Sequence, residues 1–344
     1  MDDLFTDAVR QLLADQCTPA VVRAIEGGGS PAALWGVLEA AGFADALVPE
    51  AEGGAGLSLA EAFPVMALCG AYALPVPLAE TLVGRLVLAQ AGIARPPGSL
   101  VLAEARGAGE VAGEVAGEVA GEGGLCCPDA RGGAVADWVL AVGPQGSLLL
   151  PAAQARREPS GFCLDATLTW PAAVVAAAAR VPGRPPVREW QACVHAALLS
   201  GALQQVLDRT LQYANDRVQF GKPIGKFQAV QHQLSVLAEH AYAAAMAARL
   251  AASASGTAPD RLRVAVAKAR TSEAAGEVAA LAHSIHGAIG FTHEFDLQLY
   301  TRRLHAWRQA AGSEGYWQDV LGRELVEARA GSTLDLVREL TDLR

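Results

Sequence analysis

The chain has 344 residues, of which 52% are hydrophobic, so it can bury a substantial core in two or three structural units. A formal net charge of -9 and a pI near 5.3 leave no basic excess for a phosphate backbone, which argues against a nucleic-acid partner. The six cysteines are scattered without a Cys-x-x-Cys pair, so no disulfide framework and no metal site are expected.

The first residues, Met-Asp-Asp-Leu-Phe-Thr-Asp, are acidic, whereas a secretory or transit peptide is basic before an apolar run. The longest apolar stretch, residues 172–179, is mostly alanine and far shorter than the roughly 20 residues of a membrane span. We therefore expect a cytoplasmic protein without a transmembrane helix.

Apolar residues recur at helical spacing from the start of the chain, at Phe5, Val9, Leu12 and Leu13. The glycine-rich break at residues 49–58 follows no predicted strand, so it does not fit a dinucleotide-binding loop. We predict an N-terminal helical domain over residues 1–97.

Between residues 98 and 183, short apolar runs alternate with Gly, Pro and Asp clusters, a pattern typical of short strands. A repeated Gly-Glu-Val-Ala tetrapeptide forms a low-complexity insert at 109–122, which favours a solvated loop over a binding element. We predict a small central β-domain over residues 98–183.

From residue 184 onward the pattern is helical again, with apolar residues spaced three and four apart in several long stretches. The pattern predicts a bundle of about four helices over residues 184–344, and its broad apolar faces indicate pairing between subunits. The fold class is therefore α+β, mostly α, with an N-terminal helical domain, a central β-domain and a C-terminal four-helix bundle.

Residues 217–228 join two predicted helices and read Arg-Val-Gln-Phe-Gly-Lys-Pro-Ile-Gly-Lys-Phe-Gln. Arg217 stands at a helix end, Phe220 precedes a glycine, and Gln228 begins the next helix. The donors of arginine suit a diphosphate, while a ring and an amide suit a flat heterocycle. On chemistry alone, such an arginine is more often a helix cap or a surface ion pair.

The same twelve residues resemble the acyl-CoA dehydrogenase family motif Arg-x-x-Phe-Gly-x-x-Ile-x-x-x-Gln, which crosses a dimer interface to the flavin of a neighbouring subunit. The resemblance implies that Arg217 binds the FAD diphosphate, that Phe220 packs near its adenosine half, and that Gln228 hydrogen-bonds the cofactor. FAD and an oligomer, a dimer or tetramer, are therefore expected.

A second segment, residues 284–303, resembles the family passage Ile-His-Gly-Gly-Ile-Gly-Phe-Thr. The resemblance places Gly287 where a glycine lets the backbone approach the adenosine-diphosphate part of FAD, while Ala288 replaces the second glycine. His283 and His286 lack a carboxylate or cysteine at a matching offset, so metal ligation is not expected there.

The resemblance covers nearly the whole chain, but its middle departs from the family. The usual Thr-Glu-Pro-x-x-Gly-Ser-Asp segment, which contacts the flavin ring and the acyl chain, has no clear counterpart beyond Leu102-Ala-Glu. The β-domain is also short, which puts the pocket beside the flavin in doubt.

Desaturation of an acyl thioester requires a carboxylate base. The family segment Glu-Gly-Thr/Ser aligns with residues 311–313, so Ser313 is expected to contact the cofactor, but alanine occupies the position of the base. A second family arrangement places the base at Gln191. The nearby acids Glu314 and Glu189 remain candidates, although each is more readily explained as a helix-start carboxylate.

Two hypotheses for the function follow. The chain is an acyl-CoA dehydrogenase that desaturates an acyl-CoA with FAD as hydride acceptor and passes electrons to an electron-transfer flavoprotein or a similar acceptor. Alternatively, it is a non-catalytic subunit that completes the flavin site of a heteromeric enzyme, similar to bacterial steroid side-chain dehydrogenases. The missing carboxylates favour the second hypothesis. A third hypothesis, that the chain acts only as a scaffold, applies only if no flavin is bound.

Overall fold

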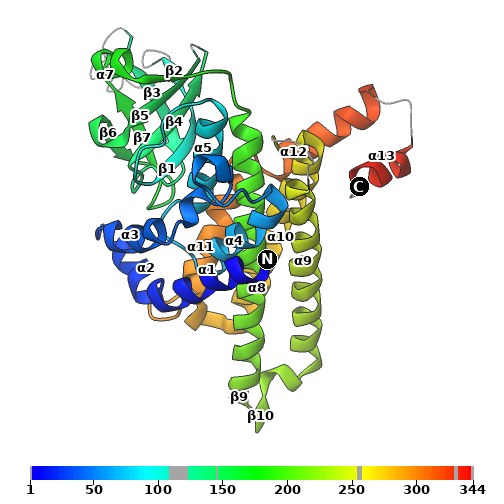
Figure 1. Ribbon diagram of the computed structural model, residues 1–344. Helices are drawn as coiled ribbons and strands as arrows, with labels where there is room; N and C mark the ends of the chain where they lie inside the picture. Colours follow the sequence, from blue (N-terminus) through cyan, green and yellow to red (C-terminus); the bar gives the residue numbers. More distant parts are fainter. Residues whose placement is uncertain (1, 108–122, 145, 254–257, 329–331, 342–344) are drawn as a thin grey trace. The chain divides into compact units, whose positions relative to one another are not determined.

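The computed structural model describes residues 2–107, 123–144, 146–253, 258–328 and 332–341 (Figure 1). The chain packs as two compact units: unit 1 comprises Met1–Ser58 and Leu74–Gln191, and unit 2 comprises Leu59–Ala73 and Ala192–Arg344. The three-domain division at 97/98 and 183/184 stays a prediction. The insert at 109–122 lies outside the described residues.

Unit 1 begins with helices whose apolar stripes turn inward. Their bounds are α1 Asp2–Gln16, α2 Pro19–Glu26, α3 Ala32–Ala40 and α5 Leu78–Gln90. The start of α2 shows why the sequence folds locally: the Thr18 side chain accepts a hydrogen bond from the Val21 N–H, and proline occupies the first helical position. Val9 and Leu13 of α1 are fully buried, as their spacing predicts.

Two four-stranded sheets follow in unit 1. Their strands are β1 Leu100–Glu104, β2 Arg106–Gly107, β3 Leu125–Ala130, β4 Trp138–Gly143, β5 Gly146–Pro151, β6 Arg156–Pro159, β7 Ala166–Trp170 and β8 Ala179–Val181, with a short helix α7 Ala172–Ala177 before β8. One sheet has the order β1-β4-β5-β8, with β1 and β4 parallel, and the other has the antiparallel order β2-β3-β7-β6.

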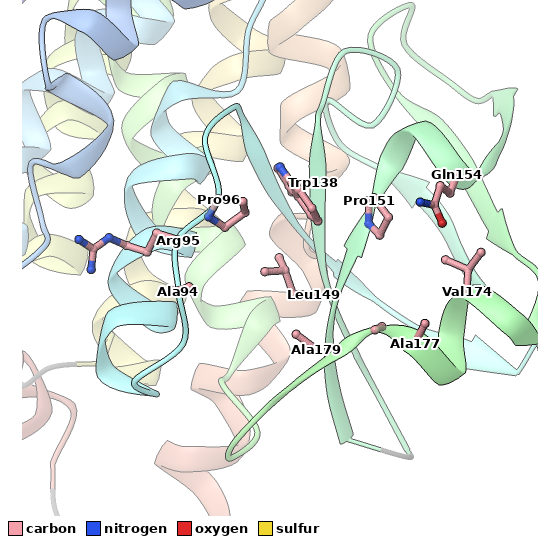
Figure 2. A pocket seen from close by; sticks show the side chains of 11 residues that line it. Ala94, Arg95, Pro96, Trp138, Leu149, Pro151, Gln154, Val174, Ala177 and Ala179 are labelled. Carbon is pink, nitrogen blue, oxygen red and sulfur yellow. The ribbon is translucent and has the colours of Figure 1, made fainter.

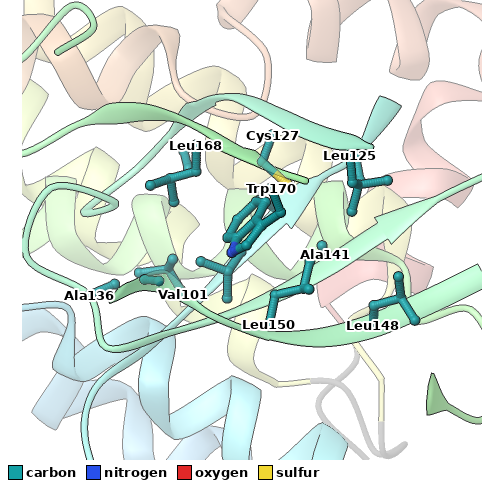
Figure 3. Packing of buried hydrophobic residues seen from close by; sticks show 14 of the residues in the cluster. Val101, Leu125, Cys127, Ala136, Ala141, Leu148, Leu150, Leu168 and Trp170 are labelled. Atoms are coloured by element: carbon teal, nitrogen blue, oxygen red, sulfur yellow. The ribbon is translucent and has the colours of Figure 1, made fainter. Parts of the chain in front are cut away.

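The two sheets enclose a common apolar core (Figure 3). Trp170 of β7 lies among leucines and valines from both sheets and is fully buried. Its indole Nε1 donates to the Pro151 carbonyl, so the ring is buried without an unsatisfied donor. Side chains pointing alternately inward explain why these strands read as short apolar runs.

Side chains from two helices occupy the outer edge of β1. Thr81 Oγ1 accepts from the Leu100 N–H at 2.9 Å and donates to the Leu100 carbonyl at 3.0 Å. At Leu102, the N–H donates to Glu80 Oε2 at 3.2 Å and the carbonyl accepts from Gln191 Nε2 at 2.8 Å. An edge strand otherwise offers these groups to a foreign strand, so the four bonds protect the sheet.

Unit 2 is built from long helices that run beside one another (Figure 1). Its elements are α4 Leu59–Ala71, α8 Val187–Asp216, the hairpin β9 Val218–Gln219 and β10 Lys222–Pro223, α9 Gln228–Ala252, α10 Arg261–His286, α11 Leu297–Gln309, α12 Glu314–Arg323 and α13 Thr333–Thr341. The first turn of α8 belongs to unit 1.

Glycines let α4 and α8 approach closely. A Cβ on Gly70 would stand 1.9 Å from the Leu198 carbonyl oxygen, and one on Gly201 would stand 1.8 Å from the Ala67 oxygen. Only glycine fits at both positions.

The predicted fold class is confirmed: the chain is mostly helical, with a small sheet region and a C-terminal helical bundle. Within the described residues, no helix combines the length and the apolar character that crossing a membrane requires.

Candidate functional site

The segment 217–228 forms a tight hairpin between α8 and α9. Gln219 pairs with Lys222, and the two loop residues Phe220 and Gly221 have φ of 51° and 78°. Two successive left-handed residues define the type I′ loop that suits two-residue hairpins. Phe220 is not a glycine, so its conformation costs on the order of 1 kcal/mol.

The base of the hairpin is anchored in unit 2. The Ile224 N–H donates to the Arg217 carbonyl at 2.8 Å, and the Ile224 side chain packs with Ala214 of α8 and Ile285 of α10. Figure 1 shows the hairpin beyond the ends of α8 and α9. The strained loop is therefore held on a rigid base.

The tip of the hairpin exposes an aromatic ring among cations. Phe220 is 91% exposed, and its ring meets the Phe227 ring edge-on at 6.2 Å between centroids. Arg217, Lys222 and Lys226 are also exposed, although the whole chain is acidic. The Arg217 guanidinium makes no hydrogen bond or ion pair with the described residues, whereas Lys222 Nζ lies 4.4 Å from the Phe227 ring centroid.

Gln228, the last of the residues predicted on this segment, is the first residue of α9 and is exposed. Arg217, Phe220 and Gln228 therefore lie on one short stretch that solvent reaches in the single chain. Their contact with FAD remains a prediction.

The end of α10 lies against the same hairpin base. The Tyr213 ring of α8 stacks on His286 at 4.3 Å between centroids, and the Tyr213 hydroxyl donates to the His286 carbonyl at 3.3 Å. Gly287 then ends the helix with φ 67° and ψ -148°, a conformation open essentially to glycine alone. No atom outside its chain neighbours lies within 4 Å of a Cβ built there, so its backbone is open to approach.

The two histidines near this loop both have pKa values below the ordinary value for histidine. Burial lowers the pKa of both, and the charge of His286 further lowers the pKa of His283. His286 Nδ1 lies 2.8 Å from the Ala282 carbonyl, so it carries the proton, and His283 stacks on Phe291 at 4.0 Å. Across the described ranges, no three His, Cys, Asp or Glu side chains gather in a way that could hold a metal ion.

Ser313 and Glu314 lie elsewhere in unit 2, where α11 turns into α12. Ser313 precedes α12 as its N-cap residue, yet its hydroxyl makes no capping bond. Glu314 forms an ion pair with Arg308. Burial by itself would raise the pKa of Glu314, but the hydrogen bond and charge of Arg308, a backbone hydrogen bond and the charge of Lys268 together leave the pKa below its usual value. A carboxylate held in this way is a poor proton acceptor.

The predicted cofactor residues therefore form two groups in unit 2. The hairpin group contains Arg217, Phe220, Gln228 and Gly287, and the turn group contains Ser313. Lys268 of α10 bonds to the turn, and Ile285 of α10 packs on the hairpin base. At a rise of about 1.5 Å per residue, the two positions are about 25 Å apart along α10. One chain does not bring the groups together.

The alternative base position lies in unit 1. Gln191 uses its amide nitrogen to hold the Leu102 carbonyl, and Glu189 stands in the first turn of α8, partly buried. Position 191 therefore carries an amide and not a carboxylate, and Glu189 lies two residues before it.

A separate cavity of about 370 Å³ lies in unit 1 (Figure 2). Its lining is mostly apolar, with Trp138, Leu149 and Pro151 from the sheet and Arg95 at its side. Arg95 is already paired with Asp45 and Glu52. None of the predicted site residues lines this cavity.

Sequence reasoning missed Lys268 and Glu80, two ionisable residues of the interior. A charged residue on the apolar face of a predicted helix is the available signal, because such a residue requires buried partners.

Helices followed by a small two-sheet region and a helical bundle constitute the acyl-CoA dehydrogenase fold. Residues 2–93 match the family model "Acyl-CoA dehydrogenase, N-terminal domain", and residues 189–326 match "Acyl-CoA dehydrogenase, C-terminal domain". The chain is 31% identical over 314 residues to acyl-CoA dehydrogenase IpdE2 of Mycolicibacterium smegmatis, an alignment that covers 90% of this chain and 94% of IpdE2. The chain belongs to the acyl-CoA dehydrogenase family.

Solved structures agree with this assignment. A variant of the Tcur3481-Tcur3483 steroid ACAD has a TM-score of 0.79 at 27% identity and covers 96% of this chain and 99% of its own. The ChsE4-ChsE5 complex from Mycobacterium tuberculosis has a TM-score of 0.79 at 24% identity, with 96% and 98% covered, a likeness of fold.

Proposed function

We propose that this chain is a subunit of an acyl-CoA dehydrogenase that completes a flavin site shared with a neighbouring subunit, while the partner supplies the catalytic carboxylate. The observation that carries the proposal is the separation of the predicted cofactor residues into two groups about 25 Å apart along α10. A hairpin that exposes Arg217 at its base and Phe220 on a strained loop supports contact with a second chain.

The residues of the hairpin group fit FAD. Arg217 and the two nearby lysines supply positive charge for a diphosphate, and Arg217 is not neutralised by a described side chain. Phe220 supplies an exposed ring, and the open backbone at Gly287 permits close approach of a ligand. In this proposal Arg217, Phe220, Gln228 and Gly287 serve the neighbour's FAD, and Ser313 serves an FAD in the chain's own half of the assembly.

The reaction proposed for the assembly is α,β-desaturation of an acyl-CoA thioester. When bound, FAD accepts the hydride from the β carbon. A carboxylate must take the α proton, and this chain has alanine at 311 and a glutamine at 191 that is already bonded to the Leu102 carbonyl. The ion pair of Glu314 with Arg308 also disfavours it as a base.

The partner is proposed to be a second acyl-CoA dehydrogenase subunit that carries an intact glutamate, and the electron acceptor an electron-transfer flavoprotein or a similar protein. Two relatives support the heteromeric form: one solved structure is named as the ChsE4-ChsE5 complex, and another as the Tcur3481-Tcur3483 steroid ACAD. The name of the Tcur3481-Tcur3483 steroid ACAD makes a steroid-derived acyl-CoA the first substrate class to test.

A self-sufficient dehydrogenase is the second candidate. IpdE2, the relative that aligns over 90% of this chain, is itself named an acyl-CoA dehydrogenase. In this case Glu314 or Glu189 would act as the base after a local rearrangement that frees the carboxylate.

Absorbance separates the two candidates. The chain is purified alone and together with an acyl-CoA dehydrogenase subunit that carries an intact catalytic glutamate, and spectra are recorded between roughly 350 and 500 nm. We expect flavin to be retained only by the mixed assembly, and anaerobic bleaching by an acyl-CoA only there. Flavin that stays bound to the isolated chain and bleaches with an acyl-CoA would overturn the proposal in favour of the second candidate.

A further inference from the structure

Lys268 is a fully buried cation in the middle of unit 2. Its ammonium group donates to Ser272 Oγ at 2.8 Å, to the Arg308 carbonyl at 2.9 Å and to the Gly312 carbonyl at 3.0 Å. These three bonds use all three donors of a lysine. Burying an ammonium group costs free energy, and this cost is offset here because every donor of Lys268 has an acceptor. The surrounding residues therefore form a specific site for this side chain.

The bonds of Lys268 converge on the connection between α11 and α12. Arg308 lies in the last turn of α11, where unsatisfied carbonyls and the helix dipole favour a cation. Ser272 reinforces the contact, since its hydroxyl also lies 3.2 Å from the Arg308 carbonyl. Lys268 therefore caps the end of α11 from the side of α10.

The turn that follows has an unusual backbone. Ala311 and Gly312 have φ of 55° and 103°, so two successive residues are in positive-φ conformations and one of them carries a side chain. Trp317 Nε1 donates to the Ala311 carbonyl at 3.1 Å, and Lys268 holds the next carbonyl, that of Gly312. Two buried donors thus hold two adjacent strained residues.

The outer side of the turn is braced as well. Arg308 pairs with Glu314, the first residue of α12. The Arg308 guanidinium also lies over α10 at Gly276, where a Cβ would stand 2.8 Å from Nη1. Lys268 therefore holds the turn through the Arg308 and Gly312 carbonyls, and the Arg308–Glu314 ion pair holds it through side chains.

We infer that Lys268 is a positioning residue, which fixes the 311–313 turn so that the Ser313 hydroxyl and the first N–H groups of α12 are preorganised for the cofactor. This role rests on the proposed function. Ser313 is an N-cap residue whose hydroxyl caps nothing in its own helix, although serine is favoured there because it does so. Its hydroxyl is thereby available to a ligand.

The test compares Lys268→Met with Thr271→Val. Thr271 is equally buried in α10, but its hydroxyl bonds to the Ala267 carbonyl of its own helix. Amide hydrogen exchange is measured on the full chain without cofactor, and FAD affinity is measured on the complete assembly by the change in flavin fluorescence.

We expect Lys268→Met to speed exchange of the amides in residues 310–316 by at least about tenfold relative to Thr271→Val, with no change in residues 218–223. We also expect it to weaken FAD binding by about tenfold or more relative to the same control. Exchange at 310–316 that matches the control would overturn the inference. Faster exchange with unchanged FAD affinity would show a structural role alone and would also overturn it.

If the Lys268→Met variant does not fold, the same measurements are made on Ser272→Ala. It removes one acceptor of the lysine and one contact of the Arg308 carbonyl while the cation stays. The same changes are expected at about threefold, and their absence counts against the inference. If the wild-type assembly binds no FAD, the proposed function fails, and this result is distinct because it does not depend on any substitution.

Discussion

Glu80 is a buried carboxyl whose hydrogen bond with the Leu102 N–H joins α5 to the edge of β1. Burial raises its pKa to about 8, the Leu102 N–H and the charge of Arg131 act in the opposite direction, and the charge of Asp165 adds to the increase. Glu80 is therefore protonated near neutral pH, with the Arg131–Asp165 ion pair as the charged neighbour that faces it. A neutral carboxyl can sit in this apolar site where a carboxylate cannot.

This pKa predicts a dependence of stability on pH. An unfolded glutamate ionises near pH 4.5 and the folded one near 8, so the folded state holds one more proton between these values. The contribution of Glu80 is complete below about pH 4.5 and is lost as pH rises through 8, with a slope of at most about 1.4 kcal/mol per pH unit.

Glu80→Gln keeps the acceptor for the Leu102 N–H and removes the ionisation. We expect the free energy of unfolding, measured by urea denaturation from about pH 5 to 9, to fall less steeply with pH in this variant. Glu50→Gln, at an exposed acid of the same unit, is the control. Equal slopes for Glu80→Gln and the wild type would show that Glu80 is already ionised in the folded chain.

At the level of the secondary-structure element, the hairpin places a phenylalanine where its loop type favours asparagine. Type I′ loops prefer Asn-Gly, and the chain has Phe220 before Gly221. A ring that is 91% exposed contributes little burial to offset this strain. The strain is better explained by a contact outside the chain than by folding.

We predict that Phe220→Asn increases the free energy of unfolding slightly, by up to about 1 kcal/mol, and weakens FAD binding in the assembly. Chemical denaturation and flavin titration measure the two effects. Val218→Thr, on the exposed strand β9, is the matched change without the backbone strain. A large loss of stability in Phe220→Asn, or FAD binding equal to that of Val218→Thr, would contradict the interpretation.

Across the whole molecule, the cationic hairpin contrasts with a chain that has a formal net charge of -9. Arg217 is proposed to bind the cofactor of the neighbouring subunit, so its substitution should weaken FAD binding in that subunit. We predict that Arg217→Ala reduces the flavin content of an assembly whose partner subunit is wild type, because one diphosphate contact is lost. Flavin per assembled complex is measured after denaturation.

Arg249→Ala is the control for this change. It removes the same charge from an exposed position in the last turn of α9, about 30 Å along the helix from its start. Equal flavin content in the Arg217→Ala and Arg249→Ala assemblies would exclude a direct role for the hairpin. If both substitutions reduce the flavin content, the cause is the change in net charge and not the loss of a contact between Arg217 and the diphosphate.

Local patterns and short segments of the sequence were enough to predict the architecture and the family. The periodicity of apolar residues predicted a helical start, a middle region of short strands and a helical bundle, because it depends on neighbours a few residues away. The residues 217–228 and 285–291 indicated the family, and the resemblance named Arg217, Phe220, Gln228 and Gly287 as candidates. Alanine at 311 and glutamine at 191 marked the missing base from the sequence alone.

The spatial distribution of these residues, in contrast, depends on tertiary contacts. These contacts grouped the hairpin with Gly287 through the Tyr213 stack and set Ser313 apart, near the other end of α10. They also brought Lys268 to the 311–313 turn and Glu80 to the edge of β1. The partners are far apart in the sequence, so no local pattern contains them, and the cost of burying each polar side chain is offset only once the chain has folded.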